Sequence, residues 1–284
     1  MEGMTERRIA EGQLPAFRQW LREEEREAAT IEKYLREVRA FAAWLEGEPV
    51  TRERIGCWKE RLAGEGRRPV TINGKLAALN KFFAFLGWED LRVRYLRVQR
   101  RLFRSARREL TREEYARLLE TAKALGRERL ALLIETICAT GIRVSELRYI
   151  TVEAAREGRA EVALKGKIRT ILLPGKLCRK LLKYARKRKT AFGEIFLTKS
   201  GKSLSRRQVW AEMKSLCARA GVEKTKVFPH NLRHLFARTF YRACRDVAGL
   251  ADVLGHSSIE TTRVYLVSTG AEHARRLGRL GLVT

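Results

Sequence analysis

The sequence lacks the features that mark membrane-spanning, secreted and disulfide-stabilised proteins. No stretch approaches the roughly 20 consecutive apolar residues that a membrane-spanning helix requires. The N-terminal sequence MEGMTERRIAEGQLPAF is charged and lacks the apolar centre of a signal peptide. The five cysteines are odd in number and never form a C-x-x-C pair, so we interpret them as buried, reduced thiols rather than disulfides or zinc ligands. These absences predict a cytoplasmic protein without a membrane partner.

Acidic residues are scarce relative to basic ones. The chain has 60 Lys and Arg against 33 Asp and Glu, which gives a formal net charge of +27. The basic residues are clustered: segment 92–110 holds eight arginines and one acidic residue, and segment 176–189 holds eight basic residues and no acidic one. Positive charge concentrated in this way predicts a polyanionic partner, most often nucleic acid.

A length of 284 residues suits about two domains. Apolar residues at helical spacing predict four helices in the first part of the chain, over 14–21, 31–45, 51–66 and 71–88, with Thr30 as the N-cap of the second. Segment 92–110 has no clean period and is interpreted as a linker. The sequence TREE at 111–114 is a capping box, in which Thr111 is the cap and Glu114 reaches back, and it opens a second domain.

The second domain changes character in its middle. Helical patterns run to about residue 156 and are followed by RAEVALKGKIRTILLP, two β-rich runs around Lys165, Gly166 and Lys167 that predict a hairpin. The segment EIFLT at 194–198 is a candidate for a further strand, and helical patterns then resume. The predicted fold class is mainly α in two domains, with a small β-hairpin or sheet in the second.

Histidine is also scarce, yet three of the four histidines stand close together. His230 and His234 lie in FPHNLRHLF, and His256 follows in VLGHSSIETTRVYL. Histidines at i and i+4 share a helix face in zinc proteases with an H-E-x-x-H motif, but Asn231 stands here in place of the glutamate. Arg233 would add a fixed positive charge beside the metal. Zinc is therefore disfavoured, and we interpret His234 as a packing residue.

The remaining polar residues form an ordered set. In ATGIRVSEL, Arg143 follows a glycine turn at a predicted helix start, where backbone N–H groups and a guanidinium can bind phosphate oxygens. A lysine at the hairpin follows, then His230 with Arg233, then His256, then Tyr265. Two arginines, one lysine, two histidines and one tyrosine suffice to attack a phosphodiester without a metal ion. We therefore predict neither a metal nor a cofactor.

This ordered set resembles the tyrosine recombinase, or phage integrase, family, and most closely its short Xer-type members. The resemblance rests on TGIRVSEL, LKGKIRTILLP, PHNLRHLFA and LGHSSIETTRVYL and extends over nearly the whole chain. It implies a helical, SAM-like core-binding domain over 1–91, an Arg-rich linker over 92–110 and a catalytic domain over 111–284. It also implies that the tail, 272–284, packs on a neighbouring protomer.

The family's chemistry assigns a role to each matching residue. Tyr265 is implied to be the nucleophile, which forms a 3′-phosphotyrosyl link and frees a 5′-hydroxyl. Arg143 and Arg233 are implied to grip the non-bridging phosphate oxygens, where charge builds in the transition state. Glu146 is implied to orient neighbouring groups.

Proton transfer falls to the remaining members. His230 is implied to bind the phosphate and accept the tyrosine proton, and His256 to donate a further hydrogen bond to the phosphate. Lys165 is implied to protonate the departing 5′-oxygen as general acid. The hairpin is one residue shorter than the usual family form, so Lys167 remains an alternative to Lys165.

The resemblance also implies the substrate and the assembly. The substrate is double-stranded DNA with paired inverted-repeat sites, exchanged through a Holliday junction in integration, excision, inversion or chromosome-dimer resolution. Four protomers act on two synapsed duplexes in the cytoplasm, at the nucleoid, and the protein is a monomer or dimer off DNA. The linker arginines expected to meet phosphates are Arg92, Arg94, Arg97, Arg100, Arg101, Arg104, Arg107 and Arg108.

Two other functions compete with this interpretation. A type IB topoisomerase shares the tyrosine, arginine, lysine and histidine chemistry but relaxes supercoils as a monomer. The compact HNLRH, LGH and tyrosine arrangement and the helical first domain favour the recombinase. A catalytically silent DNA-binding protein would be indicated by loss of Arg143, Arg233 or Tyr265, and all three are present.

Overall fold

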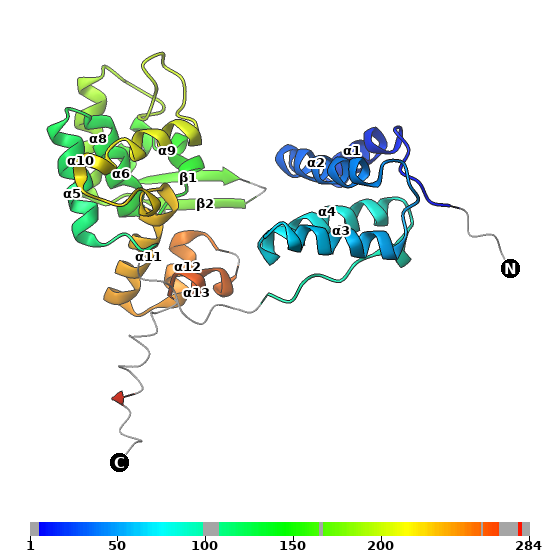
Figure 1. Ribbon diagram of the computed structural model, residues 1–284. Coiled ribbons are helices and arrows are strands. Elements are labelled where there is room, and N and C mark those ends of the chain that lie inside the picture. Colours follow the sequence, from blue (N-terminus) through cyan, green and yellow to red (C-terminus); the bar gives the residue numbers. More distant parts are fainter. Residues whose placement is uncertain (1–5, 99–107, 165–166, 257, 267–277, 280–284) are drawn as a thin grey trace. The chain divides into compact units, whose positions relative to one another are not determined.

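The computed structural model describes residues 6–98, 108–164, 167–256, 258–266 and 278–279. The chain divides into two compact units, Met1–Arg100 and Arg101–Thr284. Both are mainly helical, and the second holds a two-stranded antiparallel sheet (Figure 1). The predicted fold class is therefore confirmed. Within the described residues, no helix has both the length and the apolar character needed to cross a membrane.

The first unit is a bundle of four helices, α1 (Gln13–Glu23), α2 (Ala28–Leu45), α3 (Arg52–Gly64) and α4 (Pro69–Phe85), followed by the short helix η1 (Glu89–Leu91). The rings of Phe17, Phe41, Phe82 and Phe83 are fully buried at its centre. The aromatic residues of the first domain thus build its core, because they recur at helical spacing on the inner faces.

The predicted cap of α2 is wrong by one turn. The helix begins at Ala28 with Glu27 as N-cap, so Thr30 lies inside it. The two alanines that precede Thr30 are strong helix formers and extend the helix towards the N-terminus. After η1, the chain runs along α4, where the Asn80 and Asn73 side chains each bond both the N–H and the carbonyl of one residue, Val93 and Leu96 respectively.

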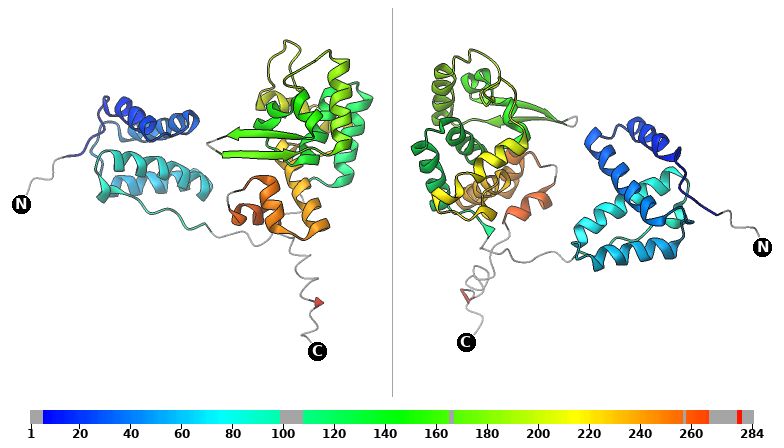
Figure 2. Two further views of the ribbon diagram at one scale, coloured as in Figure 1. Left: turned by 180° about the vertical axis from the view of Figure 1, so that it is seen from behind. Right: turned by 45° about the horizontal axis from the view of Figure 1, so that its top comes forward.

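The second unit begins with α5 (Arg112–Ala124), and its predicted capping box of Thr111 and Glu114 is confirmed. Then come α6 (Glu128–Thr140), η3 (Val144–Tyr149), α7 (Val152–Glu157), β1 (Arg159–Leu164), β2 (Lys167–Leu172), α8 (Gly175–Lys187), α9 (Arg206–Lys214), α10 (Cys217–Ala220), η4 (Lys224–Lys226), α11 (Pro229–Cys244), α12 (Val247–Leu254) and α13 (Ile259–Leu266). Figure 2 shows α12 and α13 at one end of this unit, beside α11.

The predicted hairpin is confirmed by the pairing of β1 with β2, in which Leu164 faces Lys167 and Arg159 faces Leu172. The predicted strand at 194–198 is wrong. Among the described residues this segment makes only isolated antiparallel bridges, Glu194 with Thr151 and Leu197 with Ser203, and neither bridge extends into a ladder.

All five cysteines are free thiols, but they are not all buried as predicted. Cys178 and Cys217 are buried and Cys138 is half-buried, whereas Cys57 and Cys244 are exposed. Cys57 lies on the outer side of α3, and Cys244 is the last residue of α11, where the helix has left the core. Sequence composition does not carry this distinction, which depends on helix orientation.

Candidate active site

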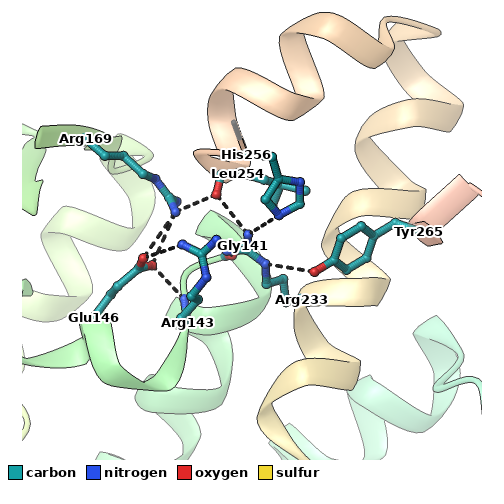
Figure 3. A network of polar contacts seen from close by, with 8 residues as sticks. All are labelled: Gly141, Arg143, Glu146, Arg169, Arg233, Leu254, His256 and Tyr265. Carbon is teal, nitrogen blue, oxygen red and sulfur yellow. Dashed lines mark hydrogen bonds and ion pairs between the residues drawn. The ribbon is translucent and has the colours of Figure 1, made fainter. Parts of the chain in front are cut away.

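Arg233 is the centre of a polar network in the second unit. Pro229 stands at the start of α11, which places His230 in the first turn and Arg233 one turn later. The Arg233 side chain is 1% exposed. Its Nη1 donates to the carbonyl of Gly141, its Nη2 donates to the carbonyl of Leu254 at 2.9 Å, and its Nε donates to the Tyr265 hydroxyl at 3.4 Å (Figure 3). A buried guanidinium is thus held by neutral oxygens, and burial lowers its pKa.

The turn after α6 positions Arg143 in the site. Gly141 ends that helix with φ +65°, and a Cβ there would lie 2.4 Å from the Phe236 ring, so both conformation and space require glycine. Arg143 is the N-cap of η3, and Glu146 closes on it. The Glu146 carboxylate accepts from the Arg143 backbone N–H at 2.7 Å and from its Nη1 at 2.9 Å. The Arg143 side chain remains 44% exposed, while Glu146 is 1% exposed.

Tyr265 lies among three histidine rings. It projects from α13 and is 5% exposed. Its ring centroid is 4.4 Å from that of His234, 5.5 Å from that of His256 and 5.7 Å from that of His230. The rings of His230 and His234 also meet edge to face at 4.6 Å. The clustering of histidines along the chain therefore corresponds to a cluster in space, built around a tyrosine.

His256 is neutral in this arrangement. Burial, together with the positive charges of Arg233, Arg143 and Arg169 and the nearby His230, lowers its pKa to about 4. Its Nε2 lies 2.8 Å from Arg233 Nη2, a group that can only donate, so Nε2 is the acceptor. The proton of the neutral ring is therefore on Nδ1, which lies 2.8 Å from the Thr262 hydroxyl and donates to it.

Sequence reasoning missed Arg169 and Thr262. Arg169 comes from β2, and its Nη1 contacts both Glu146 oxygens, at 3.3 and 3.4 Å, and donates to the Leu254 carbonyl at 2.6 Å. Its Nε and Nη2 are buried without a hydrogen-bond partner in the described structure. Burial lowers its pKa to about 10, and Glu146 opposes that shift. The only hint in the sequence is a basic residue two positions after Lys167.

The network therefore joins four elements into one cationic site. Arg143 binds Glu146, Glu146 binds Arg169, and Arg169 and Arg233 share the Leu254 carbonyl (Figure 3). The network holds three guanidinium groups and a single carboxylate, that of Glu146, which leaves an excess of positive charge that suits an anion. Among the described residues, no group of three or more His, Cys, Asp or Glu side chains is placed to hold a metal ion.

Several predicted residues are not placed in this site. Lys165 lies outside the described residues, as do Arg100, Arg101, Arg104 and Arg107, and nothing is described of the Lys167 side chain. Arg92, Arg94 and Arg97 are exposed residues of the first unit, where Arg92 pairs with Glu89. Arg108 is exposed in the second unit, and its carbonyl accepts from the Asn231 amide.

Comparisons with known proteins agree with this architecture. The family model described as the phage integrase family matches residues 108–272, and the phage integrase N-terminal SAM-like domain matches residues 14–90. Tyrosine recombinase XerA of Pyrococcus furiosus is 30% identical over 282 residues, and the match covers 96% of this chain and 94% of XerA. Tyrosine recombinase XerD of Brucella suis is 33% identical over 270 residues, covering 83% and 85%.

Solved structures show the same fold. A lambda integrase tetramer bound to a Holliday junction matches with a TM-score of 0.73 at 18% identity, over 92% of this chain and 78% of its own. The pre-cleavage complex of XerH with its difH substrate matches with a TM-score of 0.67 at 21% identity, over 83% and 74%.

Proposed function

This chain belongs to the phage integrase family, the tyrosine recombinases, and we propose that it cleaves and rejoins duplex DNA at specific sites with Tyr265 as the nucleophile. The observation that carries the proposal is the contact of the Tyr265 hydroxyl with the Arg233 guanidinium, within the cluster that also holds His230 and His256. A phenol with a pKa near 10 is a weak nucleophile at neutral pH, so it requires positive surroundings to ionise.

In this proposal Arg143 is the first residue of the site that contacts the DNA phosphate. Its guanidinium is the exposed one of the cluster, whereas Arg233 is buried and already donates to two carbonyls, to His256 and to Tyr265. The scissile phosphate therefore meets Arg143 first and reaches Arg233 as Tyr265 and His256 give up their contacts with it. Both arginines then stabilise the charge that develops on the non-bridging oxygens.

The cleavage step exchanges one phosphodiester for another. The Tyr265 oxygen bonds to phosphorus while the bond from phosphorus to the 5′-oxygen breaks, and His230 accepts the phenolic proton. A hairpin lysine, Lys165 or Lys167, gives its proton to the leaving 5′-oxygen. Because the phosphotyrosyl link preserves the energy of the original bond, the reverse attack by a 5′-hydroxyl rejoins DNA without ATP.

His256 takes part by gaining a proton. As a neutral ring with its proton on Nδ1, it presents Nε2 as an acceptor and cannot donate to phosphate. A phosphate drawn to Arg233 adds negative charge beside the ring and raises its pKa, which favours the doubly protonated form. Nε2 then becomes the donor that the family resemblance assigns to this histidine, and Thr262 keeps the ring oriented.

The assembly follows from the paired sites of such a reaction. We propose four protomers on two synapsed duplexes with inverted-repeat sites, exchanging strands through a Holliday junction, and a monomer or dimer off DNA. We propose that the reaction takes place in the cytoplasm, at the nucleoid. Family membership and the likeness to XerA over 96% of this chain favour this activity over topoisomerase-type relaxation and over silent DNA binding.

A nicked suicide duplex tests the proposal. Loss of the short 5′ fragment after cleavage prevents rejoining, so a covalent protein–DNA complex should accumulate, joined through a 3′ phosphate. Because side chains supply every step, the yield should be the same in EDTA. A yield abolished by EDTA, or a 5′-linked complex, would overturn the mechanism.

A further inference from the structure

Helix α8 divides into one apolar and one basic face. Leu177, Cys178, Leu181, Tyr184 and Ala185 are buried against the rest of the unit. The exposed cations recur at each turn along the opposite side of the helix, so that one charge follows another at intervals of about 5.4 Å. We call these residues the α8 basic face: Lys176, Arg179, Lys180, Lys183, Arg186 and Lys187.

Few of these charges are compensated. Lys180 pairs with Glu135 and Lys187 with Glu128, both from α6. For Lys176, Arg179, Lys183 and Arg186, the described structure contains no ion pair. A solvated basic face that served only solubility would carry both signs, as most protein surfaces do. Helix α8 contains no acidic residue, so its exposed face carries positive charge alone.

A pocket of about 380 Å³ continues the positive surface beyond the end of the helix. It lies between α7 and α8, and three of its lining side chains are cationic: Arg156, Arg186 and Lys189. Thr190 adds a hydroxyl, and Leu182 with neighbouring alanines and a valine gives the pocket an apolar floor. None of these lining side chains is acidic, so the pocket has the same sign of charge as the α8 basic face.

This surface is separate from the candidate active site. Helix α6 contacts both α8 and α11, and α11 carries His230 and Arg233. In all three views α8 lies at the end of the unit away from α12 and α13 (Figures 1 and 2). A phosphate held near Tyr265 therefore cannot also contact the α8 basic face.

Two features select the ligand. An amphipathic basic helix can lie on an anionic membrane only if its apolar face is available, and the apolar face of α8 is buried in the core. The remaining polyanions are nucleic acids and acidic proteins. A helix of 13 residues is about 20 Å long, which equals the axial rise of roughly six base pairs of duplex at 3.4 Å each.

We propose that the α8 basic face and its pocket bind the phosphate backbone of a second DNA duplex segment, separate from the segment that is cleaved. The inference rests on the proposed function, because DNA is the polyanion that this protein already holds. It adds a contact that would let each protomer keep a second stretch of DNA close while the first is cut and exchanged.

A titration of the trapped complex tests the proposal. Wild-type protein is first joined covalently to a short suicide duplex, which fills the catalytic site, and a labelled duplex of about 20 base pairs is then added. We expect saturable binding of the second duplex that weakens steeply with salt. The triple variant Arg179→Gln, Lys183→Gln, Arg186→Gln should lower this affinity at least about tenfold at ~0.1 M salt and reduce the salt slope by about three. Glutamine keeps the helix propensity of the residues it replaces.

The matched control removes the same charge elsewhere in the unit. Lys123, Arg219 and Lys224 are exposed on α5, α10 and η4, and their replacement by glutamine should leave the second affinity within about twofold. Equal losses in both triple variants, or none in either, would overturn the proposal. Loss of polyglutamate binding with DNA binding unchanged would assign the face to an acidic protein instead.

Failure of the proposed function would look different. In that case wild-type protein would form no covalent complex. The catalytic site would then be filled by saturating unlabelled short duplex, and the binding of the second, labelled duplex would be measured in its presence. The α8 triple variant should still form the covalent complex at the wild-type rate, since none of its changes lies in the catalytic network.

Discussion

A single carbonyl oxygen, that of Leu254, connects two arginines of the candidate site, Arg169 and Arg233. Leu254, the last residue of α12, accepts from Arg169 on β2 and from Arg233 on α11. The next residue, Gly255, turns the chain with φ +63° and leaves room for the Arg169 side chain. Arg169 is thus a positioning residue that ties the hairpin to the phosphate-binding arginines.

Substitution of Gly255 by alanine should separate this positioning from general stability. A Cβ at 255 would lie 2.2 Å from Arg169 Cδ, so the arginine must move. Gly126→Ala is the control, because Gly126 has φ +65° and nothing within 4 Å of a new Cβ. The left-handed backbone alone should lower the free energy of unfolding of each variant by about 1–2 kcal/mol. Only Gly255→Ala should slow suicide-substrate cleavage, by at least about tenfold. Equal cleavage rates in the two variants would remove Arg169 from the mechanism.

His256 should make the stability of the DNA-free protein depend on pH. Its pKa is about 4 in the folded chain and 6.5 ordinarily. Between these values the unfolded chain binds more protons, so the free energy of unfolding should fall as pH drops from about 6.5 to about 4. His256→Gln lacks this titration. Urea midpoints measured from about pH 7 to about pH 4.5 should therefore fall further for wild type than for the variant, and parallel curves would contradict a neutral His256.

At the scale of elements, sequence reasoning succeeded where a local rule decides the structure. The Thr111 capping box and the hairpin of β1 and β2 each depend on a single short stretch of sequence, and both are confirmed. Arg169 was missed because its partner at Leu254 is 85 residues away, and no local pattern encodes that contact. The strand expected at 194–198 is wrong for the same reason. A strand requires a continuous ladder of hydrogen bonds to a neighbouring strand, and a local sequence pattern does not show whether such a neighbour exists.

The hairpin contains both candidates for the general acid, Lys165 and Lys167. Register pairs Leu164 with Lys167, and Lys165 stands between them in the sequence. If Lys165 is the acid, Lys165→Ala should lose cleavage on a normal substrate and regain it on a 5′-phosphorothiolate, because sulfur leaves without protonation. Lys167→Ala should keep most of its activity on both substrates. Rescue of Lys167→Ala alone would reassign the role to Lys167.

At the scale of the whole molecule, the tail over 272–284 is the segment expected to couple protomers. It lies almost wholly outside the described residues, and its Leu277, Leu280, Leu282 and Val283 give the sequence an apolar side. We propose that it packs on a neighbouring protomer. Deletion of 272–284 should leave binding to one site nearly intact and impair synapsis and recombination, measured by gel shift and by product yield. Equal loss of both would mean that the tail completes its own domain.

The identity of the residue joined to DNA tests the central claim most directly. Wild-type protein trapped on the nicked suicide duplex can be digested with protease and nuclease, and the peptide that retains a nucleotide can be sequenced by mass spectrometry. The chain has seven tyrosines, and we predict that the modified one is Tyr265, held at its 3′ phosphate. Tyr265→Phe keeps the ring that packs against His234 and removes the attacking oxygen, so it should bind DNA and form no covalent complex. A nucleotide on any other residue, or a covalent complex formed by Tyr265→Phe, would contradict the account.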